Sequence, residues 1–217
     1  MIELGLKVTL AYLLGAVLGS LLVGFVRGGV DIRKLGSGNA GGTNALRTQG
    51  KMFALWVMII DIGKGILAAA VIPPLSLSGV GIDPAVDRSL VLYGVAFAAI
   101  FGHVFPVWFG FRGGKGGATA AGLLCFLAPG VALPVLGSWL LVVFTTGFVG
   151  LATITASLAA VVFLGFTALP ERSGLFMFAC ATAALLIYAH RGNVRRMLDG
   201  TESRFASPAA RWLRRGQ

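Results

Sequence analysis

Long apolar segments separated by short polar loops constrain this chain more than any other feature. Of its 217 residues, 57% are hydrophobic and only 12% are charged, whereas about a quarter of the residues in a soluble domain are charged. About 20 apolar residues carry a helix across the bilayer core. The pattern therefore predicts an all-α membrane protein, a polytopic bundle of about seven transmembrane helices, some short or broken, with polar glycine-rich cytoplasmic loops. We expect one integral-membrane domain over residues 1–217.

One apolar stretch, residues 118–144, is long for one span and short for two, and Pro129 and Pro134 interrupt it. We expect two short spans there, or one span and a re-entrant piece, because either keeps the arginine-rich tail on the inside. Broken segments are tolerated where they line a protein cavity. The other predicted spans cover residues 2–26, 52–72, 89–109, 150–169 and 174–189.

Small residues recur every fourth position in the first span, at Ala11, Gly15 and Gly19, which predicts close helix packing. We expect this span to be a retained helix and not a cleaved signal peptide. Cys125 and Cys180 lie in apolar runs and are expected to be packing residues. With only two histidines in the chain, no metal site is predicted.

The net charge of +10 is unevenly distributed, and this predicts the orientation. Basic residues concentrate in the first two loops and in the tail, so the positive-inside rule places these regions in the cytoplasm and the N-terminus in the periplasm, across the inner membrane. No folded basic domain accompanies the tail, so we expect anionic membrane lipid and no nucleic acid as its partner. The basic residues are Arg27, Arg33, Lys34, Arg47 and Lys51, then Arg112 and Lys115, then Arg191, Arg195, Arg196, Arg204, Arg211, Arg214 and Arg215.

The first polar loop, residues 35–50, reads LGSGNAGGTNALRTQG and predicts a phosphate-binding cradle. Its glycines leave amide N–H groups open to a ligand, and Arg47 adds a planar fork that suits phosphate. The alternative is a flexible glycine hinge. A G-x-G-x-x-G match within the loop does not indicate a dinucleotide site, because a membrane span precedes it instead of a strand. The predicted ligand-binding residues are Ser37, Gly38, Asn39, Gly41, Thr43, Asn44 and Arg47.

The second polar loop, RGGKGGAT over residues 112–119, is not a P-loop because it lacks the required glycine and hydroxyl positions. Amides in the loop and the point charge of Lys115 can still hold a phosphate. The alternative is that Lys115 is an anchor at the membrane surface. The predicted binding residues are Gly113, Gly114, Lys115, Gly116 and Thr119.

The third polar segment, HRGNVRRMLDGTE over residues 190–202, places His190 and Asn193 three apart, on one side of a helix end. His190 could be a general acid or a phosphate donor; the alternative is an interfacial histidine held by a carbonyl. We expect Glu202 to pair with a nearby arginine and Asp199 to be solvated.

Asp61, Lys64 and His103 lie inside predicted spans. Each charge at mid-membrane costs roughly 2.5 to 3.5 kcal/mol on insertion scales, so Asp61 and Lys64 should pair and face the bundle interior. We expect them to give structural support, with His103 orienting groups nearby. The polar segments offer many phosphate donors and almost no carboxylate base. This suggests a reaction in which phosphate leaves or supplies its own base.

The three polar segments, together with the D-x-x-K-G of residues 61–65, resemble the motifs of a bacterial family, the integral-membrane glycerol-3-phosphate acyltransferases that use acyl phosphate. The matching runs are GSGNAGGTNALR from Gly36, GHVFPVWFGFRGGKGGAT from Gly102 and H-x-x-N-x-x-R-x-x-x-G-x-E from His190. One departure is Gly117, where most members of the family have valine.

The resemblance implies acyl transfer from acyl phosphate to the 1-hydroxyl of glycerol 3-phosphate, which gives lysophosphatidic acid and phosphate. It implies no cofactor, no direct use of acyl-CoA or acyl carrier protein, and a functional link to a soluble enzyme that makes acyl phosphate. For the mechanism, we expect direct attack without an acyl-enzyme. Arg47 and Lys115 would then stabilise the leaving group, and Ser37 and His190 would orient the hydroxyl.

These assignments require Arg47, Lys115 and His190 to meet in one electropositive pocket at the cytosolic leaflet. Two alternatives remain. One is an anion or phosphate-ester transporter, for which the chain lacks inverted repeats. The other is a structural membrane protein with lipid-binding loops.

Overall fold

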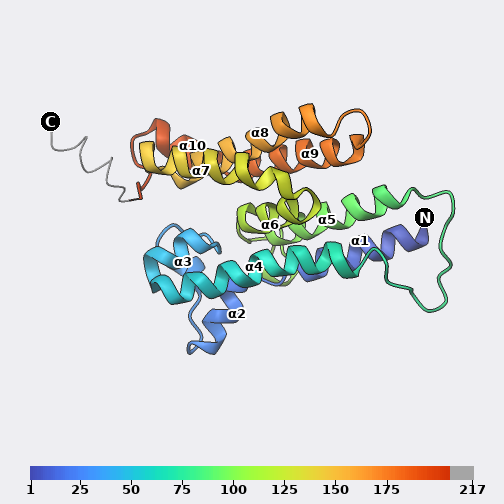
Figure 1. Ribbon diagram of the computed structural model, residues 1–217. Helices are drawn as coiled ribbons and strands as arrows, with labels where there is room; N and C mark the ends of the chain where they lie inside the picture. Colours follow the sequence, from blue (N-terminus) through green and yellow to red (C-terminus); the bar gives the residue numbers. More distant parts are fainter. Residues whose placement is uncertain (206–217) are drawn as a thin grey trace. The chain divides into compact units, whose positions relative to one another are not determined.

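The computed structural model describes residues 1–205, and the regular secondary structure of this part is helical, with no strand (Figure 1). The predicted all-α fold is therefore confirmed. Arg211, Arg214 and Arg215 of the basic tail lie outside the described residues. The chain falls into two compact units, Met1–Leu127 and the residues from Ala128 onward.

The first unit is built around α4, which contacts every other α-helix of this unit. Its longest partners, α1 and α5, pack along each other (Figure 1). The elements are α1 (Ile2–Gly15), α2 (Gly19–Val26), η1 (Ile32–Lys34), α3 (Gly42–Gln49), α4 (Lys51–Val71), α5 (Arg88–Val104), η2 (Val107–Phe109) and α6 (Gly117–Leu127).

The small-residue stripe of the first span packs as predicted. Ala11 is fully buried. A Cβ atom on Gly15 would overlap the backbone of Ala99 in α5, and one on Gly19 would lie 2.9 Å from the carbonyl oxygen of Val57 in α4. The stripe therefore lets α5 and α4 approach the first span at backbone distance.

The sequence pattern suggested one continuous helix for the first span, but the structure shows a broken one. The α1 helix ends at Gly15, α2 begins at Gly19, and the two axes differ by 45°. No proline marks this break. The break is stabilised by side chains of α4 and by the close packing of Gly15 and Gly19 against neighbouring helices.

Two apolar clusters hold the first unit together. One joins α1, α4 and α5 through residues that include Ala68, Val91 and Val95. The other joins α2, η1, α3 and α4 through Val23, Ile32, Ala45, Phe53, Ala54 and Val57. The second cluster lies beneath the first polar loop and fixes the segments on both sides of it.

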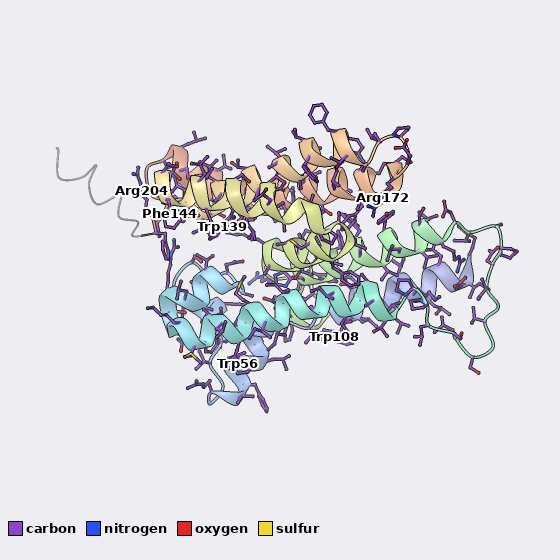
Figure 2. The ribbon with its side chains drawn as sticks, viewed as in Figure 1. Trp56, Trp108, Trp139, Phe144, Arg172 and Arg204 are labelled. Atoms are coloured by element: carbon purple, nitrogen blue, oxygen red, sulfur yellow. The ribbon has the colours of Figure 1, made fainter. Side chains whose placement is uncertain are left out.

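The second unit is a helical hairpin stack in which α8 packs against both α7 and α9. Trp139 of α7, labelled in Figure 2, donates from Nε1 to Thr153 Oγ1 of α8 at 3.4 Å. The last helix turns away from α9 by 49°. The elements are η3 (Pro129–Val131), α7 (Ala132–Thr146), α8 (Val149–Thr167), α9 (Ser173–Ala189) and α10 (Arg191–Leu198).

Among the described residues, four helical segments are long and apolar enough to cross a membrane, and up to six qualify if each bent pair is one span. The ambiguous stretch 118–144 divides at Ala128 into α6 and a second helical segment, so the prediction of two segments is confirmed. The α6 helix has 11 residues, or about 16 Å of rise, and is too short to cross the roughly 30 Å core alone.

Candidate functional site

Asn44 holds the first polar loop from the inside. Its side chain is 1% exposed, and its amide donates to the carbonyls of Ile32 at 2.9 Å, Leu35 at 3.0 Å and Asn39 at 2.9 Å. Its Oδ1 accepts from the Ser37 backbone N–H at 3.0 Å. Asn44 was predicted to bind a ligand, but in this structure its polar atoms are directed at the loop itself.

The glycines on either side of Ser37 adopt backbone conformations that favour glycine. Gly36 has φ 57° and Gly38 has φ 71°, in the left-handed region. A Cβ atom on Gly36 would also overlap Asn44 Oδ1. Ser37 is exposed between them, and Arg47 is exposed on α3. The loop therefore presents these two predicted ligand-binding side chains at its surface.

We predict that Asn44→Ala lowers the free energy of unfolding by about 1–3 kcal/mol, because buried carbonyls lose their donor. The matched control is Thr48→Ala, which removes only the 2.9 Å hydrogen bond from Thr48 Oγ1 to the Asn44 carbonyl. Thermal unfolding of both variants in detergent measures the difference. Equal melting temperatures for Asn44→Ala and wild type would contradict the role assigned to Asn44.

Arg33 connects the segment before the first loop to the second loop. Its guanidinium pairs with Asp31 through contacts of 2.9 and 3.0 Å. It also stacks over the Phe109 ring at 5.2 Å and reaches the Arg112 carbonyl at 3.5 Å. The hydrogen bonds between Arg33 and Asp31 lower the pKa of Asp31 and raise the pKa of Arg33. The segment that leads into the first polar loop therefore contacts the start of the second loop within the first unit.

The second loop folds back on the end of α5. The Gly114 N–H donates to the His103 carbonyl at 3.0 Å, and Gly116, with φ 81°, turns the chain into α6 at Gly117. Lys115 is half-buried between them. A lysine in a glycine loop that enters a helix start is an arrangement suited to an anion.

Asp61, Lys64 and His103 form a buried cluster beneath this loop. Lys64 Nζ lies 3.0 Å from Asp61 Oδ1 and 2.8 Å from His103 Nδ1. All three residues are at most 5% exposed. The predicted pairing of Asp61 with Lys64, and their position in the bundle interior, are confirmed.

The same cluster satisfies the backbone at the break between α1 and α2. Lys64 Nζ donates to the Val17 carbonyl at 2.7 Å, and Asp61 Oδ1 accepts from the Gly19 N–H at 3.1 Å. A broken helix inside a membrane leaves such groups without partners. Lys64 and Asp61 on α4 therefore supply the hydrogen-bond partners that the backbone at the break would otherwise lack.

Thr119 is fully buried near the start of α6, and its Cγ2 would meet a Cβ atom on Gly65 at 2.9 Å. Its Oγ1 has no hydrogen-bond partner among the described residues, and neither has Oγ of the buried Ser20. Gly65 thus allows α6 to pack against α4 beside Lys64, while the Thr119 hydroxyl stays inside the first unit.

His190, in the second unit, is 5% exposed and lies between α9 and α10. Its Nδ1 is 2.8 Å from the Leu186 carbonyl. A carbonyl can only accept, so Nδ1 carries the hydrogen, and in the neutral ring Nε2 is the nitrogen able to accept. The structure shows the carbonyl contact that we considered as an alternative, and this contact fixes the tautomer.

Asn193 and Glu202 form a second polar group in this unit. Asn193 Nδ2 donates to Glu202 Oε1 at 2.5 Å, and Arg196 Nε donates to Glu202 Oε2 at 2.6 Å. The predicted pairing of Glu202 with an arginine is confirmed. Asp199, expected to be solvated, is 58% exposed and 4.0 Å from Arg195.

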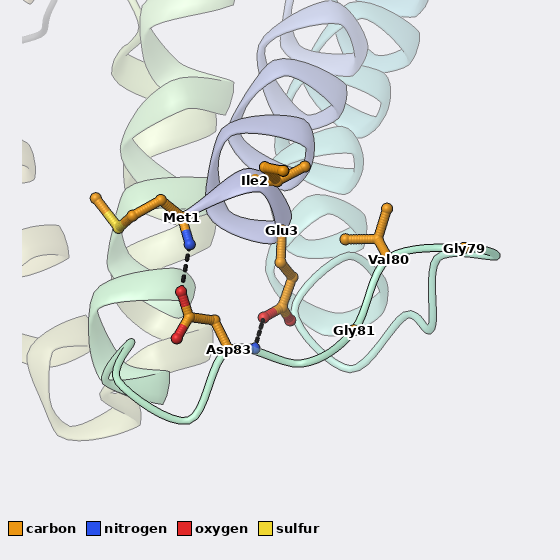
Figure 3. Close-up of a pocket in the computed structure, with 7 residues that line it drawn as sticks. All are labelled: Met1, Ile2, Glu3, Gly79, Val80, Gly81 and Asp83. Carbon is orange, nitrogen blue, oxygen red and sulfur yellow. Dashed lines mark hydrogen bonds and ion pairs between the residues drawn. The ribbon is translucent and has the colours of Figure 1, made fainter.

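A further charged cluster, absent from the predictions, lies at the start of α1. Glu3 and Lys7 are 3% and 2% exposed and pair at 2.7 Å. Arg88 donates to both Glu3 oxygens at 2.8 and 3.1 Å. The Asp83 backbone N–H also donates to the Glu3 carboxylate (Figure 3). Two opposite charges four apart inside an apolar span are the sequence signal that could have identified this pair.

Comparisons with known proteins agree on one family. The profile described as glycerol-3-phosphate acyltransferase matches residues 6–200. The chain is 40% identical to the glycerol-3-phosphate acyltransferase of Aquifex aeolicus, over 91% of this chain and 97% of that protein. It is 38% identical to the Chlorobium phaeobacteroides strain BS1 protein of the same name, over 89% of this chain and 93% of that protein.

Solved structures give the same result. The crystal structure of PlsY, an integral membrane glycerol 3-phosphate acyltransferase, in its glycerol 3-phosphate form matches with a TM-score of 0.80 and 37% identity. The match covers 94% of this chain and 96% of that one. Its lysophosphatidic acid form matches with a TM-score of 0.78. The prediction of an integral membrane protein is therefore confirmed.

Proposed function

Since this chain belongs to the glycerol-3-phosphate acyltransferase family, we propose that it acylates the 1-hydroxyl of sn-glycerol 3-phosphate with acyl phosphate as donor. The products are lysophosphatidic acid and phosphate. One observation carries the proposal beyond the family assignment. Two glycine-rich loops that suit phosphate, one bearing Arg47 and the other Lys115, both lie in the first unit, and Arg33, which precedes the first loop, reaches the Arg112 carbonyl at the start of the second.

The chemistry of the polar segments supports acyl phosphate as the donor. They provide cationic and amide donors, while the carboxylates near them, Asp31, Asp61 and Glu202, are already paired with cations. A reaction without a carboxylate base needs a substrate that is already activated. Acyl phosphate meets this need, because its phosphate both leaves and can take the proton.

The proposed step is a direct transfer. The 1-hydroxyl oxygen attacks the acyl carbon, the bond from that carbon to the phosphate oxygen breaks, and the hydroxyl proton goes to the departing phosphate. Arg47, Lys115 and loop amides stabilise the negative charge that develops on the leaving group. Ser37 would orient the hydroxyl, and His190 keeps the orienting role that the family resemblance implies.

The remaining predicted residues fit around this step. The remaining predicted binding residues would hold the two phosphate groups; they are Asn39, Thr43, Thr119, Asn193 and the loop glycines 38, 41, 113, 114 and 116. We place the site on the cytoplasmic side of the inner membrane with the N-terminus outside, supported by the basic residues of the loops. A soluble enzyme that makes acyl phosphate would then supply the donor.

We predict that purified protein in detergent converts acyl phosphate and glycerol 3-phosphate to lysophosphatidic acid with release of one phosphate for each acyl group transferred. Acyl-CoA and acyl carrier protein should give no product. A radiolabelled acyl group should not remain on the protein when glycerol 3-phosphate is omitted. A label trapped on Ser37 would refute direct transfer, and uptake of glycerol 3-phosphate into sealed vesicles without product would favour a transporter.

A further inference from the structure

We propose that His103 is the positioning residue of the loop that carries Lys115, and that it works from the buried pair of α4. The contact itself is a property of the fold. Only its consequence for turnover rests on the proposed function.

The partners of Lys64 define which nitrogen of His103 faces which neighbour. Lys64 Nζ is surrounded by three acceptors, Asp61 Oδ1 at 3.0 Å, the Val17 carbonyl at 2.7 Å and His103 Nδ1 at 2.8 Å. An ammonium group has three hydrogens and no lone pair to accept with. With Lys64 charged, Nδ1 of His103 accepts from it and the hydrogen of the ring is on Nε2; the acceptor Asp61 Oδ1 lies farther from Nδ1, at 3.5 Å.

The Nε2 edge of the ring faces the second loop. A Cβ atom on Gly114 would overlap Nε2 and the two ring carbons beside it. A Cβ atom on Gly113 would overlap the His103 carbonyl, and the Gly114 N–H donates to that carbonyl at 3.0 Å. His103 thus contacts the loop with both its ring and its backbone, one residue before Lys115.

These contacts form a chain of support from α4 to the loop. The Asp61–Lys64 pair fixes the Nδ1 side of the ring, the packed ring fixes the Gly113–Gly114 backbone, and that backbone sets the position of Lys115. The ring supports the loop by packing against Gly114. A displacement of about 1 Å in a catalytic group can cost on the order of 100-fold in rate, so this support matters for turnover.

Two variants test the two contacts of the ring separately, the Nδ1 contact with Lys64 and the packing of the Nε2 edge against the loop. His103→Asn retains an acceptor near the Nδ1 position and removes the edge that supports the loop. His103→Gln places an amide near the Nε2 position and removes the acceptor for Lys64. The measurements are thermal unfolding, hydrogen exchange of the amides of residues 112–116, and kcat and KM with acyl phosphate.

We expect His103→Asn to melt close to wild type, while exchange in the loop becomes at least about tenfold faster because local support is lost. Its kcat should fall about tenfold or more, with the KM for glycerol 3-phosphate unchanged, since Lys115 acts on the leaving group. His103→Gln should melt at a lower temperature, and its loop exchange and kcat should change less than in His103→Asn, because the amide still packs against Gly114.

The opposite order, with His103→Asn like wild type and His103→Gln defective in the loop, would overturn the proposal in favour of a purely structural role in the ion pair. Equal losses in both variants, in step with their melting temperatures, would overturn it as well, and so would wild-type exchange and turnover in both. Hydrogen exchange needs no substrate. A wild-type protein without turnover on acyl phosphate would therefore refute the proposed function and leave the exchange result decisive for His103.

Discussion

Lys115→Ala is expected to lower kcat/KM for acyl phosphate by about 100- to 1000-fold while the protein inserts and melts as wild type does. Removal of one group that stabilises developing charge in a dry site typically costs this much. Lys115 is half-buried between Gly114 and Gly116 and does not belong to the Asp61–Lys64–His103 cluster. Its loss should therefore affect the transition state and leave the packing of the first unit intact.

Lys34→Ala is the matched control, because it removes the same charge from an exposed position at the end of η1. Its kcat/KM should remain within about threefold of wild type, as expected for a screened surface charge. Lys115→Arg should recover little, since a planar fork does not replace a point charge in a tight loop. Comparable activity in Lys115→Ala and Lys34→Ala would show that leaving-group stabilisation lies elsewhere.

The features that could be predicted from the sequence are those that depend on local spacing. Runs of about 20 apolar residues predicted the membrane helices, and the repeat at Ala11, Gly15 and Gly19 predicted a close helix contact that the structure shows. The separation of Asp61 and Lys64 by three positions puts both on one side of a helix. Because charges in a membrane are costly, their pairing followed from that spacing.

Other features depend on contacts between residues far apart in the chain, and local sequence patterns do not predict such contacts. The break between Gly15 and Gly19 has no proline, because its polar groups are satisfied by α4 across more than 40 positions of sequence. Lys64 and His103 are 39 positions apart. Only the folded structure brings His103 Nδ1 next to the Lys64 ammonium group.

Asn44 illustrates a different limit. An asparagine in a glycine-rich loop can bind a ligand or can hold the loop in shape, and both uses need the same donors. The structure directs its amide to three carbonyls within the chain. Gly36 and Gly38 then follow as the residues that let the backbone wrap around it. Residue type alone could not separate these two uses.

The largest effect on stability is expected for Lys64→Met. Methionine fills a similar volume without charge, so the change leaves the Asp61 carboxylate buried beside an uncharged chain, removes the donor to the Val17 carbonyl and frees His103 Nδ1. Breaking a buried pair by removing one partner costs about 3–5 kcal/mol, because the remaining charge stays desolvated. We expect the protein to melt at a much lower temperature in detergent, with loss of monodisperse material on purification.

The paired test is the double variant Asp61→Asn with Lys64→Met. It removes both charges and keeps an amide beside the Gly19 N–H, so it should be more stable than Lys64→Met alone. Lys51→Met, exposed at the start of α4, removes a lysine from the same helix and should melt within a few degrees of wild type. If Lys64→Met melted like Lys51→Met, the break in the first span would be held by helix packing alone. The double variant could instead be less stable than Lys64→Met alone. The hydrogen bond from the Gly19 N–H to the charged Asp61 carboxylate would then stabilise the protein by more than the unpaired buried charge destabilises it.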